Sequence, residues 1–116
     1  MKLLIAGSRG FKDYKSLCET IEQLFNNEKI DLIISGGAYG ADQLGERYAK
    51  EHGIPVKQYL PDWNMYGRSA GIRRNRTMCQ VADCLIAFWD GESRGTRFTI
   101  EYMKSLGKRY EVCLYK

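Results

Sequence analysis

Histidine is almost absent from this chain, and its cysteines are scattered. Histidine occurs once in 116 residues, as His52, so a serine or cysteine nucleophile would lack a histidine base unless His52 folds into the site. The four cysteines form no Cys-x-x-Cys pair, whereas zinc sites need ligands paired at short spacing. We therefore expect no metal, and we interpret the cysteines as reduced, small residues of the core.

Long apolar runs are absent as well. No stretch approaches the ~20 apolar residues that a helix needs to cross a bilayer. The apolar start ends at Gly7 and is too short for a signal peptide. We expect a soluble, cytoplasmic protein with no membrane partner. Its 44% apolar and 28% charged residues are typical of a globular chain and predict one domain over residues 1–116.

Acidic residues are missing from one basic segment. The net charge is +4, but residues 1–62 hold eight Lys/Arg against nine Asp/Glu, and residues 63–116 hold ten against five. No acid occurs between Asp62 and Asp83, where four arginines fall within nine residues. The overall excess is mild, so nucleic acid is not expected as a partner. The arginine cluster instead indicates a small anionic ligand, because the planar guanidinium binds phosphate bidentately.

Short apolar runs alternate with stretches of helical periodicity along the whole chain. We expect strands at residues 2–6, 31–35, 54–59, 83–88 and 110–115. We expect helices at residues 13–27, 39–52, 72–82 and 96–106, with residues 60–71 irregular. Apolar strands joined by helices indicate a parallel sheet covered on both faces. Right-handed crossovers then predict an α/β, Rossmann-like doubly wound fold with five strands in the order 3-2-1-4-5.

Three glycine-containing loops each follow a predicted strand and lead into a predicted helix. They cover residues 7–11, 35–42 and 90–96. In such a fold all three lie at the carboxyl edge of the sheet, where glycine allows close approach of the backbone and helix starts offer free N–H groups. We therefore predict a site for a phosphate-bearing ligand. Its candidate residues are Gly7, Ser8, Arg9, Ser35, Gly36, Gly37, Gly40, Asp42, Trp63, Arg68, Arg73, Arg74, Asn75, Arg76, Ser93, Gly95 and Thr96.

Two common nucleotide-binding motifs are missing from these loops. None reads Gly-x-Gly-x-x-Gly, and the second strand ends in Ser35 rather than in the acid that holds an adenosine ribose. No Gly-x-x-x-x-Gly-Lys-Ser/Thr occurs either. We therefore expect neither an NAD-dependent dehydrogenase nor a P-loop NTPase, and we expect no cofactor.

The order of the loop motifs carries a family resemblance. The motifs are Gly7-Ser8-Arg9-x-Phe11, Gly36-Gly37-Ala38-x-Gly40-Ala41-Asp42, Gly67-Arg68-x-Ala70-Gly71, Arg74-Asn75-Arg76-x-Met78 and Gly95-Thr96. They resemble the SLOG superfamily, which includes the DprA/Smf DNA-processing proteins and the LOG phosphoribohydrolases, and are most similar to its small YspA/YpsA-related branch. The resemblance implies binding of a nucleotide or nucleotide-derived small molecule of the ADP-ribose type, as a sensor or signal-sequestering module. It also implies a homo-oligomer.

The resemblance leaves two other functions open. In LOG enzymes an arginine and a glutamate cleave the N-glycosidic bond of a nucleoside monophosphate. Arg74 stands four residues before Met78, as that arginine does. The glutamates expected after Gly-Thr are missing, because Arg97, Phe98 and Thr99 occupy those places, and Glu101 is the nearest acid. Arg74 and Glu101 are thus the catalytic candidates for a phosphoribohydrolase, and the missing glutamates favour a binding module over an enzyme. Single-stranded DNA binding of the DprA type is the third hypothesis.

Overall fold

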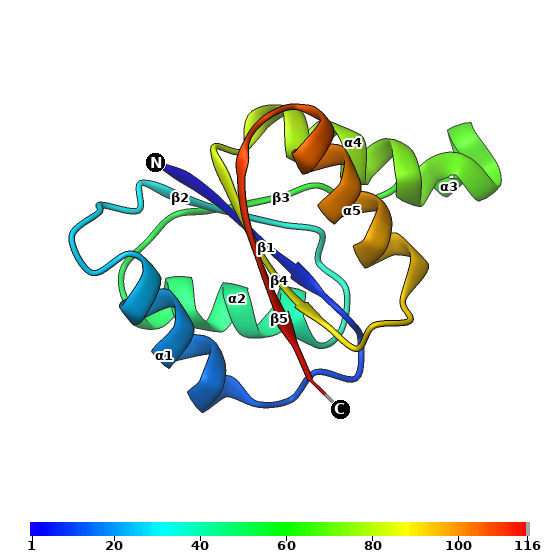
Figure 1. Ribbon diagram of the computed structural model, residues 1–116. Helices are drawn as coiled ribbons and strands as arrows, with labels where there is room; N and C mark the ends of the chain where they lie inside the picture. The colour runs from blue at the N-terminus through cyan, green and yellow to red at the C-terminus, as the bar shows by residue number, and fades with distance from the viewer. Residues whose placement is uncertain (116) are drawn as a thin grey trace.

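A five-stranded parallel sheet forms the centre of the protein. The computed structural model describes residues 1–115. Its strands are β1 (Lys2–Gly7), β2 (Leu32–Ser35), β3 (Val56–Gln58), β4 (Cys84–Trp89) and β5 (Arg109–Leu114). They pair in parallel in the order β3-β2-β1-β4-β5 (Figure 1), which confirms the predicted topology.

Two layers of helices cover the two faces of this sheet (Figure 1). Helices α1 (Tyr14–Leu24) and α2 (Ala41–Glu51) pack on one face, and α4 (Ala70–Val81) and α5 (Arg94–Ser105) pack on the other. Successive residues of a strand point to opposite faces. Leu3 and Ile5 therefore join the core under α1 and α2, while Leu4 and Ala6 join the core under α4 and α5. Burial on both faces is the reason that the three central strands, β2, β1 and β4, read as apolar runs. The edge strands β3 and β5 are exposed or only partly buried and carry charged residues.

The segment before α4 is more ordered than its composition predicts. Residues 60–71 were expected to be irregular, but they contain a one-turn helix, α3 (Trp63–Tyr66), and a 3-10 turn, η1 (Gly67–Ser69). The Asp62 carboxylate starts α3 by accepting a hydrogen bond from the Met65 N–H at 3.0 Å. A cap of this kind stabilises one turn without any apolar periodicity.

Two helices also begin earlier than predicted. Helix α4 starts at Ala70 rather than Ile72, and α5 starts at Arg94 rather than Thr96. Before α5, the Asp90 carboxylate accepts hydrogen bonds from the N–H groups of Glu92 and Ser93, both at 2.9 Å. This turn orders the loop up to the helix. Among residues 1–115, no helix combines the length and the apolar character that crossing a membrane requires.

Gly40 allows the loop after β2 to pack directly against the loop after β1. Its φ is +82°, and a Cβ atom there would lie 2.5 Å from the carbonyl oxygens of both Ser8 and Arg9. The Ala41 N–H donates to the Ser8 carbonyl at 3.4 Å. Both the positive φ and this close approach require glycine.

We expect Gly40→Ala to lower the free energy of unfolding by about 3 kcal/mol or more, because the new methyl group overlaps two carbonyl oxygens. Gly91 is a matched control, since its φ is +83° but nothing lies within 4 Å of its Cβ position. Gly91→Ala should lose only about 1 kcal/mol from backbone strain. Urea denaturation of both variants measures the difference, and equal losses would show that packing at Gly40 is unimportant.

Candidate functional site

A cleft opens at the carboxyl edge of the sheet, at the ends of β1 and β4. Its volume is about 350 Å³. These two strands are the switch point of the topology, where ligands bind in open α/β sheets. Most of its lining comes from three parts of the chain: the end of β1 and the loop after it, the loop after β4 with α5, and α4. These residues are Ala6, Gly7, Ser8, Arg9, Gly10, Asp90, Ser93, Gly95, Thr96, Thr99, Arg74, Asn75 and Met78. Only Ala38 and Asp42 come from the loop and helix start after β2.

Serine hydroxyl groups join the loops after β1 and β4 at this cleft. The Ser93 hydroxyl donates to the Ser8 hydroxyl oxygen at 2.9 Å, and the Asp90 N–H donates to the same oxygen at 3.0 Å. The N–H groups of Ser93 and Glu92 hold the pKa of Asp90 down to about 2. The Ser93 side chain makes no capping hydrogen bond at the start of α5. The first N–H groups of an α-helix have no partner within the helix, so those of Gly95 and Thr96 remain available to the cleft.

The start of α2 has one N–H group used within the chain and an acid in its first turn. Gly40 precedes this helix and offers no side-chain cap, and the Ala41 N–H is used by the Ser8 carbonyl. The carboxyl group of Asp42 is buried in the first turn. Of these two helix starts, that of α5 suits an anion better, because no acidic residue lies in its first turn.

Asp42 is the buried acid of the cleft. Its Oδ2 atom accepts a hydrogen bond from the Ala38 N–H at 3.2 Å. Burial raises the pKa of Asp42 to about 6, although the Ala38 N–H and the positive charges of Arg74 and Arg9 favour its ionised form. The carboxyl group therefore changes charge just below neutral pH.

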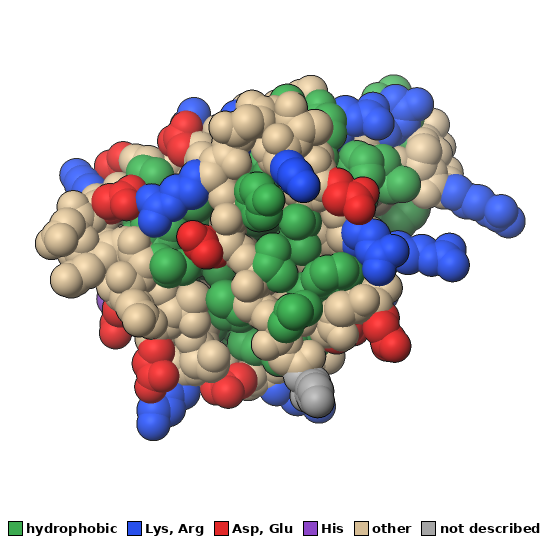
Figure 2. Space-filling model, viewed as in Figure 1, with side chains coloured by type: hydrophobic (Ala, Val, Ile, Leu, Met, Phe, Trp, Pro, Cys, Tyr) green, Lys and Arg blue, Asp and Glu red, His purple; other side chains and the backbone are tan. Residues whose placement is uncertain are grey.

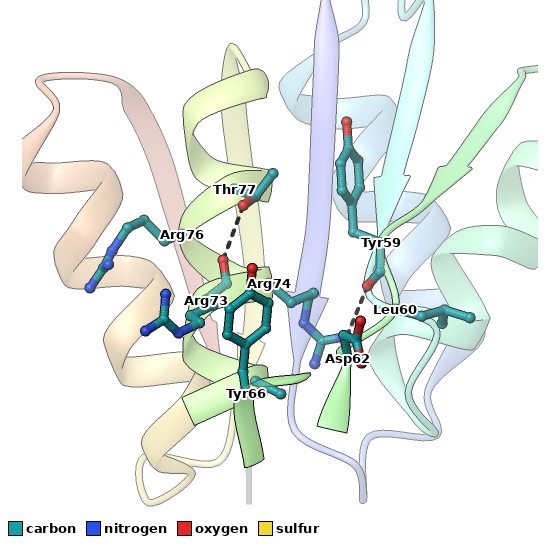
Figure 3. Close-up of a pocket in the computed structure, with 9 residues that line it drawn as sticks. Tyr59, Leu60, Asp62, Tyr66, Arg73, Arg74, Arg76 and Thr77 are labelled. Carbon is teal, nitrogen blue, oxygen red and sulfur yellow. Dashed lines mark hydrogen bonds between the residues drawn. The ribbon is translucent and has the colours of Figure 1, made fainter. Parts of the chain in front are cut away.

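Arg74 links the carboxyl ends of β2 and β3. Its Nη1 donates to the Gly36 carbonyl at 2.6 Å and to the Tyr59 carbonyl at 3.1 Å, and its Nε donates to Asn75 Oδ1 at 2.7 Å. Figure 3 shows the side chain reaching from α4 to the Tyr59 carbonyl. Burial lowers the pKa of this arginine, while the charge of Asp42 opposes that shift. Arg74 is therefore a structural residue as well as a wall of the cleft.

The loop after β2 uses its predicted site residues for its own structure. The Ser35 hydroxyl donates to Glu46 Oε2 at 2.6 Å and accepts the Gly37 N–H at 3.1 Å, while Gln58 donates to both oxygens of Glu46. A Cβ atom on Gly36 would lie 2.7 Å from Arg74 Nη1. Ser35, Gly36, Gly37 and Gly40 thus shape the site without lining the cleft. Sequence analysis missed Glu46, although its spacing of four from Asp42 places both on one face of α2.

Arg73 and Arg76 lie in a different cavity, which has a volume of about 330 Å³. It is lined by Tyr59, Leu60, Asp62, Tyr66, Ala70, Arg73, Arg74, Arg76 and Thr77. Arg74 is the one residue that lines both cavities. Three further candidates, Trp63, Arg68 and Glu101, are exposed and line neither of these cavities.

The doubly wound sheet and its polar cleft at the switch point define a Rossmann-like domain with an anion-compatible carboxyl edge. The chain belongs to the YspA, cpYpsA-related SLOG family, whose model matches residues 1–66, more than half of the chain. It is also 33% identical over 113 residues to the Gene 61 protein of Mycobacterium phage D29, covering 91% of this chain and 90% of that protein. No solved structure matches. Family membership confirms the resemblance and supports a nucleotide-related binding or LOG-like role in general.

We expect Arg74→Ala to reduce the free energy of unfolding by about 2–3 kcal/mol, because two carbonyl groups at the strand ends lose their charged donor. The neighbouring Arg73→Ala removes the same charge from an exposed position and should cost about 1 kcal/mol or less. Chemical denaturation of the two variants gives the comparison. Equal stability of the two would contradict a structural role for Arg74.

Asp42 should make the protein less stable as the pH rises from about 4 to about 6. The unfolded chain releases this proton near pH 4, whereas the folded chain releases it at about 6. Over this range the folded state binds more protons, so the free energy of unfolding falls with pH. In Asp42→Asn this contribution is absent. The stability of the variant relative to the natural chain should rise by about 2 kcal/mol between pH 4 and pH 7, and a pH-independent difference would contradict it.

Proposed function

We propose that the protein binds a phosphate-bearing nucleotide derivative, of the ADP-ribose type, in the cleft between the ends of β1 and β4. It holds this ligand as a sensor or sequestering module rather than transforming it. The observation that carries the proposal is the uncapped start of α5, where Gly95 and Thr96 line the cleft. A helix start of this kind binds phosphate through its free N–H groups and its positive dipole end.

Positive charge around the cleft supports a phosphate there. Arg9 is exposed and lines the cleft from the loop after β1, and Arg74 lines it from α4. Figure 2 shows Lys and Arg side chains gathered on the side of the molecule formed by α3, α4 and the start of α5. Asp42 and Asp90 also line the cleft, but N–H groups of their own loops hold both carboxyl groups. The arginines are therefore the charged groups that favour a phosphate there.

The cleft provides less support for N-glycosidic cleavage. Glu101 lies outside it, so the acid available to stabilise a cationic sugar or activate water is Asp42 or Asp90. Asp90 is engaged by the turn before α5. Asp42 is a buried acid with a pKa of about 6, which suits proton transfer near neutral pH. This single feature keeps a LOG-type phosphoribohydrolase as the second candidate, and release of free adenine from AMP would identify it.

Gly95→Val is expected to abolish nucleotide binding without unfolding the protein. A Cβ atom at Gly95 meets only Asn75 Nδ2, at an ordinary 3.7 Å, so the fold has room for a side chain. The valine methyl groups would instead occupy the space that a phosphate needs at the helix start. Isothermal titration with AMP and ADP-ribose should show at least a roughly hundredfold loss of affinity, of the size expected when charged hydrogen bonds to the phosphate are lost.

Gly71→Val is the matched control for this experiment. Gly71 is also the second residue of a twelve-residue helix, its nearest Cβ neighbour lies at 3.6 Å, and it lines neither the cleft nor the second cavity. This variant should bind as the natural chain does, and both variants should melt within a few degrees of it. Full affinity in a folded Gly95→Val protein would overturn the proposal. Mass spectrometry of nucleotides released on denaturing the purified protein would identify the natural ligand.

A further inference from the structure

The second cavity has chemistry that the proposed phosphate site does not use. It lies between the end of β3 and the outer side of α4, and it combines aromatic and basic side chains. Figure 3 shows the Tyr66 ring in front of α4, with Arg73 on one side and Arg74 and Asp62 on the other. The Arg73 guanidinium stacks 4.4 Å from the centre of this ring. Its Nε donates to the Ser69 hydroxyl oxygen at 3.0 Å, which fixes its position.

Arg74 connects this cavity to the cleft. The guanidinium lines both, and its Nη1 and Nε are held by the hydrogen bonds to Gly36, Tyr59 and Asn75. The cleft lies at the ends of β1 and β4, and the second cavity lies beyond the end of β3. Parallel strands are about 4.8 Å apart, so β4 and β3, separated by three spacings, are about 14 Å apart. Each cavity alone is near the lower limit of about 300 Å³ for a small-molecule site.

The side chains of the second cavity suit a nucleoside better than a bare phosphate. The exposed Tyr66 ring provides a face on which a base can stack. Asp62 lines the same cavity, and no ion pair joins it to an arginine in residues 1–115. Its Oδ1 accepts the Met65 N–H. A carboxylate repels phosphate, but it accepts hydrogen bonds from sugar hydroxyl groups.

We propose that the second cavity is a subsite for a second nucleoside, so that one ligand with two nucleoside ends joined through phosphate occupies both cavities across Arg74. The inference rests on the proposed phosphate site and names the class of ligand that fills it. One end and the bridging phosphate lie at the start of α5. The other base stacks on Tyr66, with its sugar at Asp62 and the positive charge of Arg73 beside the ring.

The probes are AMP, which has one nucleoside, and diadenosine diphosphate, in which a pyrophosphate joins two. Isothermal titration with the natural chain should show diadenosine diphosphate binding at least roughly tenfold more tightly than AMP, as one additional stacked base provides. Tyr66→Ala and Arg73→Ala should each reduce that advantage to about threefold or less, because each removes part of the stack. AMP affinity should stay within about twofold in both variants, since neither residue lines the cleft.

Tyr39→Ala and Arg109→Ala are the controls for loss of a ring and loss of a charge. Tyr39 is 72% exposed, Arg109 begins β5 at the opposite edge of the sheet, and neither lines the cleft or the second cavity. Both variants should still bind diadenosine diphosphate at least roughly tenfold more tightly than AMP. Equal affinity for the two probes, or equal effects of Arg73→Ala and Arg109→Ala, would overturn the subsite and leave the phosphate site intact. Failure of both probes to bind would overturn the phosphate site and the subsite together.

Discussion

The hydrogen bonds from Arg74 to the Gly36 and Tyr59 carbonyls determine the shape of the carboxyl edge. Parallel strands end with carbonyl groups that the sheet does not pair, and such groups need a donor when they are partly buried. Arg74 supplies it from α4, a helix 38 residues away from Gly36 in the sequence. The same side chain lines both the cleft and the second cavity. Neither cavity would have its present wall without this half-buried guanidinium.

The three loops at this edge have different roles, although all of them contain glycine. The loop after β2 is engaged in packing, because Gly40 meets the β1 loop and the Ser35 hydroxyl is held by Glu46. The loop after β4 leads into the start of α5, which has no side-chain cap and lines the cleft. Glycine thus allows close approach in both cases. In one the approaching group is the chain itself, and in the other it is the proposed ligand.

The position of the acids bears on whether the proposed ligand is held or cleaved. A glycosidase needs a carboxyl group close to the anomeric carbon, and the helix after Gly95 and Thr96 places Glu101 on the surface instead. Asp42 lies in the cleft, but it is directed at the Ala38 N–H of its own loop. These observations favour holding a ligand over cleaving it. Membership of the family supports a nucleotide-related role in general and does not specify a reaction.

The strand order, the two helical layers and the sheet edge at which the cleft lies follow from the sequence alone. Apolar runs such as Leu32–Ile34 and the glycine after each strand are local features, and handedness rules convert them into a topology. Local patterns also placed Arg9, Gly95 and Thr96 at the cleft. The same patterns could not show that Arg74 lines the cleft and Arg73 does not. The two residues are adjacent on one helix and differ only in the direction in which their side chains point.

Which side chains meet across the chain depends on how the elements pack. The Arg74 contact with Tyr59, the burial of Asp42 and the existence of the second cavity all depend on how α4 packs against the ends of β2 and β3. The one-turn helix α3 likewise depends on a single cap at Asp62. A helix of one turn is too short to show apolar periodicity in the sequence. Composition and periodicity describe each element separately. A site is formed by side chains from several elements, and its geometry is therefore fixed only when those elements pack.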